Sequence, residues 1–440
     1  MAKKRKFFKR PAGRHAAAPE TQPDLQETQL PESGGPDAPD AVEHPALQKA
    51  PPPRVSKAVY KIAAVLLAAI VVLLVIENWE NLTPGNIGNW IRTKAVGLGF
   101  GDGYPAELVG SAADAGNFGV NGGNVYVVSD TALTVMNSSA KTLFTARHSY
   151  NNPAVSAASD RYLLYNMGGT GYQVETVSGT QVSGTSENGD ITTGVIADSG
   201  KFALALQPAD MASQLCVYNK DGSLQYQYNF ADTYINAVAL NSDGTRGAVA
   251  SVTSRNGSLV TRITVLDFSE TEPIAEYESE NNLVLGLTWT ADNRILAVGD
   301  QAALVSDGSF AFESCSYDGR TVTSYCLTDS RAVVSVSNYA YGGDSTLLIF
   351  GSSAQPVEAA LPGRAAWLSS SGSKVAALLA DRVVSVDLTT GRVEAACEDV
   401  SDTKGIAMGD ESTVYMLGVQ EIRKENLKVI PAEEELSSAA

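Results

Sequence analysis

Hydrophobic residues follow two different patterns along the chain of 440 residues. One uninterrupted apolar run extends from Ile62 to Ile76 and contains no charged residue, Gly or Pro. From residue 104 to residue 424, short β-rich runs alternate with turn residues, and no long helical period appears. The first pattern predicts a helix without a polar face, and the second predicts a repetitive β domain.

The apolar run predicts a transmembrane helix. A helix from Ile62 to Ile76 measures about 22 Å, which is shorter than a hydrocarbon core of roughly 30 Å. Extension back to Ala58 supplies the missing length, because the long side chain of Lys61 can reach the interface. We therefore predict a helix over residues 58–79. The expected membrane-anchoring residues are Tyr60, Lys61, Ile62, Leu66, Ile70, Leu74, Ile76 and Trp79.

Two alternatives for this run are a cleaved signal peptide and a buried core helix. The segment of about 60 residues that precedes the run is too long for the N-terminal region of a signal peptide, and no small-residue cleavage site follows the run. Lys and Arg residues precede the run, whereas Glu77 and Glu80 follow it. Because positive charge stays on the cytoplasmic side, we expect a single-pass protein of the cell membrane with a cytoplasmic N-terminus.

The segments around the predicted helix are polar. Residues 1–57 begin with a basic cluster and become rich in Pro, which predicts a disordered cytoplasmic tail. The basic cluster has two interpretations, contact with anionic lipid or fixation of topology alone. Residues 80–103 are expected to be a linker, with a short helix starting at Thr83-Pro84 and a Gly-rich hinge from Gly97 to Gly103.

Charge is divided along the chain. The formal net charge is -17, yet residues 1–61 carry eleven Lys or Arg and seven Asp or Glu. The rest of the chain is therefore strongly acidic. A nucleic-acid groove needs clustered Lys and Arg to displace counterions, so we expect no nucleic-acid partner.

Turn signals in the β domain recur in two series with a period of about 41 residues, which is the size of a propeller blade. The first series is Gly122-Gly123, Asp160-Arg161, Ser199-Gly200, Asp243-Gly244, Asp292-Asn293, Asp329-Ser330, Gly372-Ser373 and Asp410-Glu411. The second is Ser139-Ala140, Ser178-Gly179, Asp221-Gly222, Ser269-Glu270, Asp307-Gly308, Gly351-Ser352 and Thr390-Gly391.

The two series predict an all-β fold, a β-propeller over residues 104–424, followed by a C-terminal tail over 425–440. Eight blades are favoured, and seven is the alternative. The last unit lacks an outer strand, and we expect residues 106–109 to supply it and close the ring.

This region resembles quinoprotein-like and WD40-like propellers. Together with the segment NNPAVSAASDRYLLYNMGGTGYQVET at 151–176, the layout is similar to an uncharacterised family of membrane-anchored propeller proteins of Gram-positive bacteria. The quinoprotein docking motif D-x-x-T-G-x-x-x-W is matched only in its first half, because Ala395 occupies the Trp position. Trp289 and Trp367 are expected to pack between blades.

Catalytic and metal-binding patterns are missing from the β domain. His148 is its single histidine, and the four cysteines form no C-x-x-C pair. Free thiols are favoured, with a Cys315–Cys326 disulfide as the alternative. The Asp-Gly pairs lack the further oxygen ligands at fixed spacing that a calcium loop needs. We therefore interpret them as hairpin turns in which Gly supplies a positive φ. The sequence assigns no catalytic residue, no metal and no cofactor.

Two long loops are candidate contact surfaces, residues 256–260 and residues 337–345 with Tyr339 and Tyr341. The favoured function is a non-catalytic interaction or scaffold module that binds a protein or cell-envelope ligand. The alternatives are a hydrolase or oxidoreductase that uses carboxylates around the central channel, and a signalling component that relays binding to the basic tail.

Overall fold

The computed structural model describes residues 99–430. The residues expected to anchor the chain, all within 58–79, lie outside the described residues, as do the N-terminal tail and most of the predicted linker. Within residues 99–430, no helix has the length and apolar character needed to cross a bilayer.

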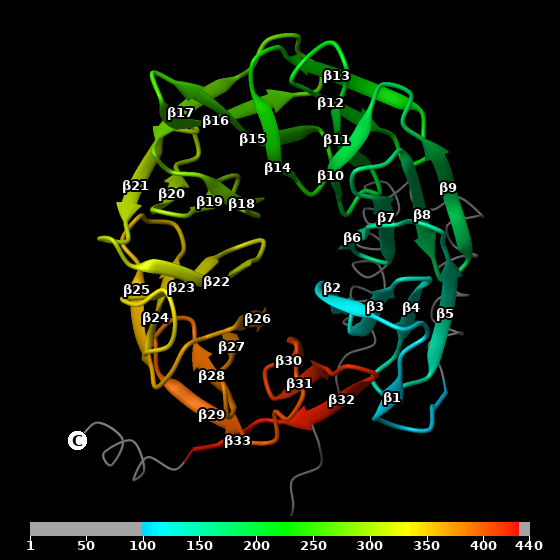
Figure 1. Ribbon diagram of the computed structural model, residues 1–440, viewed down its shortest axis with the longest axis vertical. Coiled ribbons are helices and arrows are strands. Elements are labelled where there is room, and N and C mark those ends of the chain that lie inside the picture. The colour runs from blue at the N-terminus through cyan, green and yellow to red at the C-terminus, as the bar shows by residue number, and fades with distance from the viewer. Residues whose placement is uncertain (1–98, 431–440) are drawn as a thin grey trace, which may run out of the picture. The chain divides into compact units, whose positions relative to one another are not determined.

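Eight antiparallel sheets follow one another around a ring, so the domain is an eight-bladed β-propeller (Figure 1). The eight-blade prediction is confirmed, and the seven-blade alternative is excluded. We number the blades in chain order and count the strands of each blade from the innermost outward.

The first four blades each consist of four consecutive strands. Blade 1 contains β2 (Ala113–Asn121), β3 (Asn124–Ser129), β4 (Ala132–Met136) and β5 (Thr142–Arg147). Blade 2 contains β6 (Pro153–Ala158), β7 (Arg161–Asn166), β8 (Gly171–Thr176) and β9 (Gly179–Thr185). Blade 3 contains β10 (Asp190–Ile196), β11 (Phe202–Gln207), β12 (Ser213–Tyr218) and β13 (Leu224–Phe230). Blade 4 contains β14 (Tyr234–Leu240), β15 (Arg246–Arg255), β16 (Ser258–Asp267) and β17 (Ala275–Glu280).

The last four blades include the strands that close the ring. Blade 5 contains β18 (Val284–Trp289), β19 (Ile295–Gly299), β20 (Ala302–Ser306) and β21 (Phe312–Ser316). Blade 6 contains β22 (Thr321–Leu327), β23 (Ala332–Ser337), β24 (Ser345–Phe350) and β25 (Val357–Leu361). Blade 7 contains β26 (Trp367–Ser371), β27 (Lys374–Leu378), β28 (Val383–Asp387), β29 (Val393–Cys397) and β33 (Lys428–Val429). Blade 8 contains β30 (Gly405–Asp410), β31 (Thr413–Leu417), β32 (Glu421–Asn426) and β1 (Ala106–Glu107).

Both ends of the described chain fasten the ring. Strand β1 pairs with β32, with Ala106 opposite Ile422, so the N-terminal end supplies the outer strand of blade 8 as predicted. Strand β33 crosses to the edge of blade 7 and pairs with β29, with Val429 opposite Ala395. The strands thus run beyond the end predicted at residue 424. Ala395, where the quinoprotein motif has Trp, lies under this added strand and is buried.

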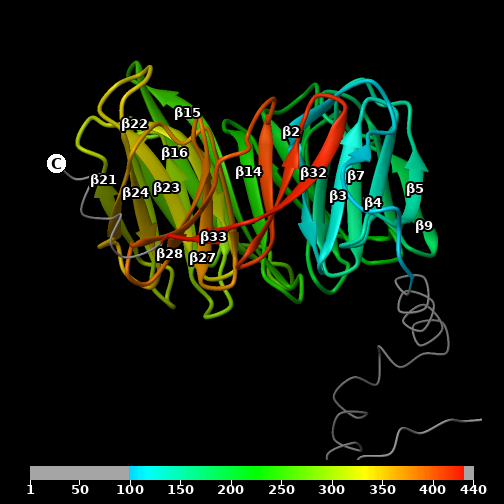
Figure 2. The ribbon, with the colours of Figure 1, turned by 90° about the horizontal axis from the view of Figure 1, so that it is seen from below.

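The two predicted turn series lie on one end of the ring, which we call the turn face. The first series joins the first and second strands of all eight blades, and the second series joins the third and fourth strands of blades 1 to 7. The opposite end, the loop face, carries the connections between second and third strands and those between blades. Figure 2 shows the two faces from the side.

Apolar side chains between neighbouring blades form the core. Alanine and β-branched residues fill the middle strands, where Ala248, Val249 and Ala250 of β15 are fully buried. Trp289 is 7% exposed and packs among the residues of blades 4 and 5, as predicted. Trp367, partly buried, packs at the junction of blades 7 and 8. Burial of this apolar surface is the main term that stabilises the ring.

Hydrogen bonds between the innermost strands link most neighbouring blades. The Asn117 side chain donates to the Pro153 carbonyl at 2.8 Å, and the Ile196 amide donates to the Ser156 hydroxyl at 3.2 Å. The Tyr325 hydroxyl donates to the Leu285 carbonyl at 2.9 Å. Further links of this kind join blades 4 and 5 through Asn236 and Val284, blades 6 and 7 through Cys326 and Ser370, and blades 7 and 8 through Met408 and Ser369.

The Gly-rich stretch predicted as a hinge is described from residue 99, and this part rests on the turn face of blade 1. The Gly101 amide donates to the Ser139 hydroxyl at 3.0 Å, and the Gly103 amide donates to the Ser139 carbonyl at 3.2 Å. A Cβ at Gly101 would lie 2.3 Å from the Lys141 amide nitrogen. Only glycine fits there, so residues 99–103 are docked and do not form a free joint.

Candidate functional site

The loop face carries two segments that differ from the short turns of the other blades. One is the hairpin of β15 and β16, whose strands are ten residues each. The other is the loop between β23 and β24, residues 338–344. Blade 5, which lies between their blades, has only residues 300–301 at the corresponding position.

The loop of residues 338–344 presents two tyrosines to solvent. Tyr339 is 64% exposed and Tyr341 is 93% exposed. The Ser337 hydroxyl donates to the Asp344 carbonyl at 2.8 Å and closes the base of the loop. Gly342 and Gly343 have φ of 71° and 76°, a conformation that side chains rarely adopt, and they turn the chain directly after Tyr341. The prediction of a long loop here is therefore confirmed, while its role as a contact surface stays a prediction.

Arg364 fixes this loop from the neighbouring connection between blades 6 and 7. Its guanidinium donates to the Tyr339 carbonyl at 3.1 Å. The exposed loop thus has an arginine bound to its backbone at Tyr339, and Tyr and Arg are among the residues most enriched at the energetic centres of protein interfaces. Sequence reasoning missed Arg364, and its position after Pro362-Gly363 in a blade connection was the one available signal.

The prediction of a long loop at residues 256–260 is wrong. Strands β15 and β16 remain paired up to Arg255 opposite Ser258, and only Asn256 and Gly257 turn the chain, with φ of 54° and 85°. This Asn-Gly pair has the positive φ values that a tight two-residue hairpin turn requires. The segment is a stiff extended hairpin, not a loop.

A carboxylate with two arginines braces that hairpin. Glu278 on β17 accepts hydrogen bonds from Arg255 at 2.8 and 2.9 Å, and from Arg262 at 3.0 and 3.2 Å. The hydrogen bonds from Arg255 and Arg262 lower the pKa of Glu278 to about 2. The bidentate geometry holds the end of β15 against the outer strand.

The turn face carries an open groove of about 510 Å³ between blades 5, 6 and 7. Its polar lining includes Asp292, Asp329, Arg331, Ser352, Ser373 and Thr389. Asp292 is paired with Arg294 at 2.8 Å, and Arg294 also donates to the Ser352 carbonyl at 2.6 Å. The lining also includes Ala291 and Leu388, and the Ser373 hydroxyl donates to the Glu411 carboxylate at 2.8 Å.

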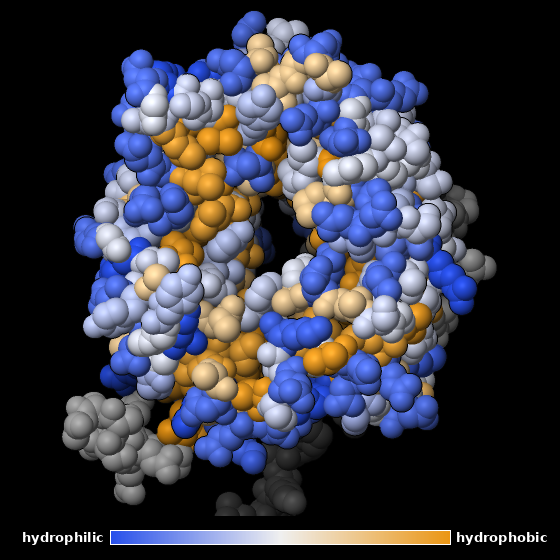
Figure 3. All heavy atoms as spheres, viewed as in Figure 1, coloured by the Kyte–Doolittle hydropathy of each residue, from blue (hydrophilic) through white to orange (hydrophobic). Residues whose placement is uncertain are grey.

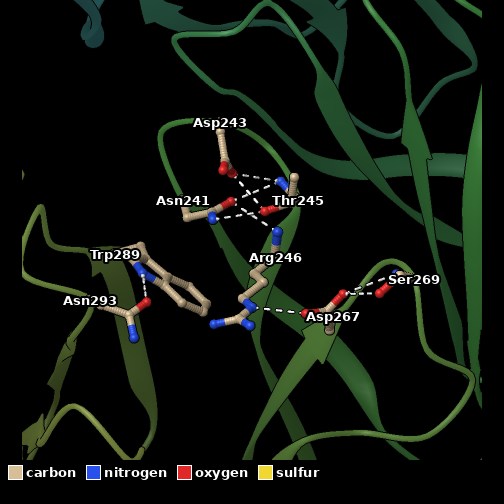
Figure 4. A network of polar contacts seen from close by, with 8 residues as sticks. All are labelled: Asn241, Asp243, Thr245, Arg246, Asp267, Ser269, Trp289 and Asn293. Atoms are coloured by element: carbon tan, nitrogen blue, oxygen red, sulfur yellow. Dashed lines mark hydrogen bonds and ion pairs between the residues drawn. The ribbon is translucent and has the colours of Figure 1, made fainter. Parts of the chain in front are cut away.

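Many acidic side chains on the turn face are used in the turns themselves. Figure 4 shows the pattern in blade 4, where Asp243 accepts from the Thr245 amide and hydroxyl at 3.0 and 2.7 Å. Asp267 accepts in the same way from Ser269 and also from Arg246 at 2.9 Å. Other carboxylates with such a bond from a Ser two residues on are Asp221, Asp307 and Asp410.

These hydrogen bonds lower the pKa of Asp221, Asp267, Asp307 and Asp410. Gly222 and Gly244 have the positive φ predicted for Asp-Gly turns, but at Asp307-Gly308 it is Phe310 that has φ of 65°. The Asp-Gly pairs are thus turns, as predicted, and the role assigned to Gly308 was wrong. An ionised carboxylate that caps a turn is a poor general acid.

The centre of the ring is open in the space-filling view (Figure 3). Across residues 99–430, no three His, Cys, Asp or Glu side chains gather in a way that could hold a metal ion. His148 lies against Tyr150 and close to the Ser129 carbonyl at 3.1 Å, and burial lowers its pKa. The four cysteines are free thiols, Cys315 and Cys326 included.

Comparison with known proteins assigns the chain to a family. A family model described as "Family of unknown function (DUF5711)" matches residues 109–358. The chain belongs to DUF5711. No curated protein matches this DUF5711 chain.

Solved structures with a similar fold are remote in sequence. Quinohemoprotein alcohol dehydrogenase ADHIIG from Pseudomonas putida HK5 gives a TM-score of 0.52 at 9% identity, over 75% of this chain and 76% of that chain. BamB from Moraxella catarrhalis gives 0.42 at 10% identity, over 73% and 93%. The Neurospora crassa Pan2 WD40 domain gives 0.42 at 9% identity, over 64% and 90%. At these identities the likeness concerns the fold alone.

Proposed function

We propose that this DUF5711 protein is a non-catalytic interaction module of the cell envelope. Its propeller binds a protein or envelope ligand through the loop face, and the segment over residues 58–79 anchors it as a single-pass membrane protein with a cytoplasmic N-terminus. The observation that carries the proposal is the exposed loop of residues 338–344, which presents Tyr339 and Tyr341 and is held at the Tyr339 carbonyl by Arg364.

The geometry of this loop supports binding. Tyr341 is almost fully exposed, while its loop is closed by Ser337 and held by Arg364. A large aromatic side chain on a braced loop loses little conformational entropy when a partner covers it. Tyrosine also offers a broad apolar surface and one hydroxyl, which suits a mixed polar and apolar partner.

A photo-crosslinking amino acid at position 341, in the full-length protein in its native host, tests the contact. We expect a discrete adduct with one partner. The matched control is position 234, because Tyr234 is 53% exposed and also lies at the loop-face end of its blade. Adducts that are the same at both positions, or absent at 341, would contradict the proposed contact loop.

A separate experiment tests the location. A topology reporter fused after Ala440 leaves β32 and β33 intact, and we expect it to report an extracytoplasmic C-terminal side. Cytoplasmic reporter activity would overturn the proposed orientation, whatever the crosslinking shows.

A further inference from the structure

The outermost strand of each blade has one unpaired edge on the circumference of the ring (Figure 1). Such edges attract other strands, and proteins commonly block them with charged residues. Six of the eight outermost strands in the described part carry a charge, on Arg147, Glu276, Glu313, Glu358, Lys428 and Glu107 among others. The two exceptions are β9 and β13, which belong to the adjacent blades 2 and 3.

Strand β13 is the better docking edge of the two. It reads LQYQYNF over Leu224–Phe230 and contains no Gly and no Pro. Strand β9 reads GTQVSGT, and its Gly184 weakens strand pairing because glycine has no side chain to pack. A strand rich in aromatic and uncharged residues favours addition of a further strand.

The sequence of β13 is chemically symmetric about Gln227. Antiparallel pairing of two copies around a two-fold axis at Gln227 would place similar residues opposite each other from Tyr226 to Tyr228, while a β-bulge at Gln225 interrupts the register toward Leu224. The opposed pairs in this regular part of the strand would be Tyr226 with Tyr228, and Gln227 with Gln227. No like charges would meet, whereas the same pairing of β17 would gather its three glutamates.

Side-chain amides already form a row that leads to this edge. Asn188 donates to Gln214 at 3.3 Å, and Gln214 donates to Asn229 at 2.8 Å. Gln227 donates to the same Asn229 oxygen at 3.4 Å. A second copy in the two-fold register would bring its Gln227 opposite Gln227 at the end of this row and continue it, as amide ladders do between stacked strands.

The charge of the domain favours this position over the rest of the rim. Residues 99–430 contain 37 Asp or Glu and 19 Lys or Arg, so two copies repel each other over most of their surface. Contact between copies is least opposed where the rim is uncharged. The partner that fits this edge is therefore the same strand of a second copy.

We propose that two copies of this protein associate through antiparallel, two-fold pairing of β13 with β13. This inference is independent of the contact loop at residues 338–344, which lies in blade 6. Two paired strands bury a small area, so we expect a weak dimer, about micromolar in Kd.

Disulfide trapping tests the register directly. In the full-length purified protein, Gln227→Cys would lie opposite itself with a Cα separation of about 4.5–5.5 Å, which a disulfide can bridge. Under mild oxidation we expect a covalent dimer of Gln227→Cys. The wild type, which has four free cysteines, gives the background, and Ser183→Cys, at an exposed position near the centre of β9, is the matched control.

A charge variant tests the same pairing without a new thiol. Gln227→Lys places two lysines opposite each other and should weaken self-association by about tenfold or more. Gln181→Lys on β9 introduces the same charge and should leave it unchanged. Both positions are exposed edge sites, so circular dichroism should show a folded ring in each variant.

The proposal is overturned if the wild type is monomeric at a protein concentration 100 times the expected Kd. It is also overturned if Gln227→Cys forms no more covalent dimer than the wild-type background. Trapping through Ser183→Cys in place of Gln227→Cys would assign the contact to β9 and would equally overturn it. Unchanged self-association in Gln227→Lys would show that the copies meet elsewhere.

Discussion

Individual carboxylates in the propeller lie in contrasting environments, which shift their pKa values in opposite directions. Glu278 is partly exposed and is paired with two arginines, whereas Glu175 of β8 is 2% exposed and accepts a hydrogen bond from the Thr180 hydroxyl at 2.7 Å. Burial raises the pKa of Glu175, so the folded state favours its neutral form.

Glu175→Gln should stabilise the fold at neutral pH by about 1 kcal/mol, because it removes the cost of a poorly compensated buried charge. In the wild type the pKa of Glu175 is raised by folding. Its contribution to stability is therefore fully present below the unfolded pKa of 4.5, and it is lost as the pH rises through the pKa of the folded state. Urea unfolding at pH 4 and pH 7 measures the difference. Glu187→Gln, at an exposed position, is the control, and a destabilised Glu175→Gln at pH 7 would contradict this account.

Glu278→Gln should destabilise the fold by about 0.5–1 kcal/mol at neutral pH and low salt, since exposure screens the pair. The pKa of Glu278 is lowered to about 2, so its contribution is present above the unfolded value of 4.5 and is lost as the pH falls toward 2. Denaturant midpoints with and without 1 M salt provide the test. Glu280→Gln on the same strand should change little, and equal effects of the two variants would argue against the bracing role.

At the scale of strands, the first and last described elements are the shortest, yet they close two different blades. Leu427, between β32 and β33, is 7% exposed and packs into the cluster at the junction of blades 7 and 8. A chain ending at Asn426 loses this side chain and the pairing of β33 with β29.

Relative to a chain ending at Ile430, the chain ending at Asn426 should lose about 2–4 kcal/mol of unfolding free energy, as expected for removal of a buried leucine. Denaturant unfolding of both truncated chains gives the difference. The variant Val429→Ala is the control, because Val429 is 81% exposed. Equal stability of the two chains would show that β33 does not fasten the ring.

The elements that the sequence predicts well are those with local chemistry. Hairpin turns on the turn face need glycine, or an Asp with a Ser or Thr two residues on, and such residues can be recognised singly. The extension of β15 past Val252 and the docking of β33 depend on pairing with distant residues, so no local signal predicts them. The same limit applies to Arg364, whose position beside Tyr339 exists only after blades 6 and 7 have packed.

At the scale of the whole molecule, closure of the ring depends on the short contact between β1 and β32. The Leu108 amide donates to the Gln420 carbonyl at 2.9 Å, directly after the two residue pairs of β1 with β32. Blades 1 and 8 are otherwise joined by side-chain packing around residues such as Tyr415 and Phe118.

Leu108→Pro should open this junction, because proline removes the donor. Leu108→Ala keeps the amide and serves as the matched control. We expect hydrogen exchange to rise at least about tenfold in β1, β2 and β32 of the proline variant, and to stay unchanged in blades 4 and 5. A uniform rise around the ring would indicate global destabilisation without local opening.

The docking of residues 99–103 on blade 1 has a mechanical consequence. Tension applied to the chain ahead of Gly99 is carried first by the Ser139 turn between β4 and β5 of blade 1. Once residues 99–103 come off that turn, the next element to carry the load is β1, the strand with two residue pairs that closes the ring. A pull from the N-terminal side would unlock the circle at blade 8 first, at a lower force than a pull on any internal strand.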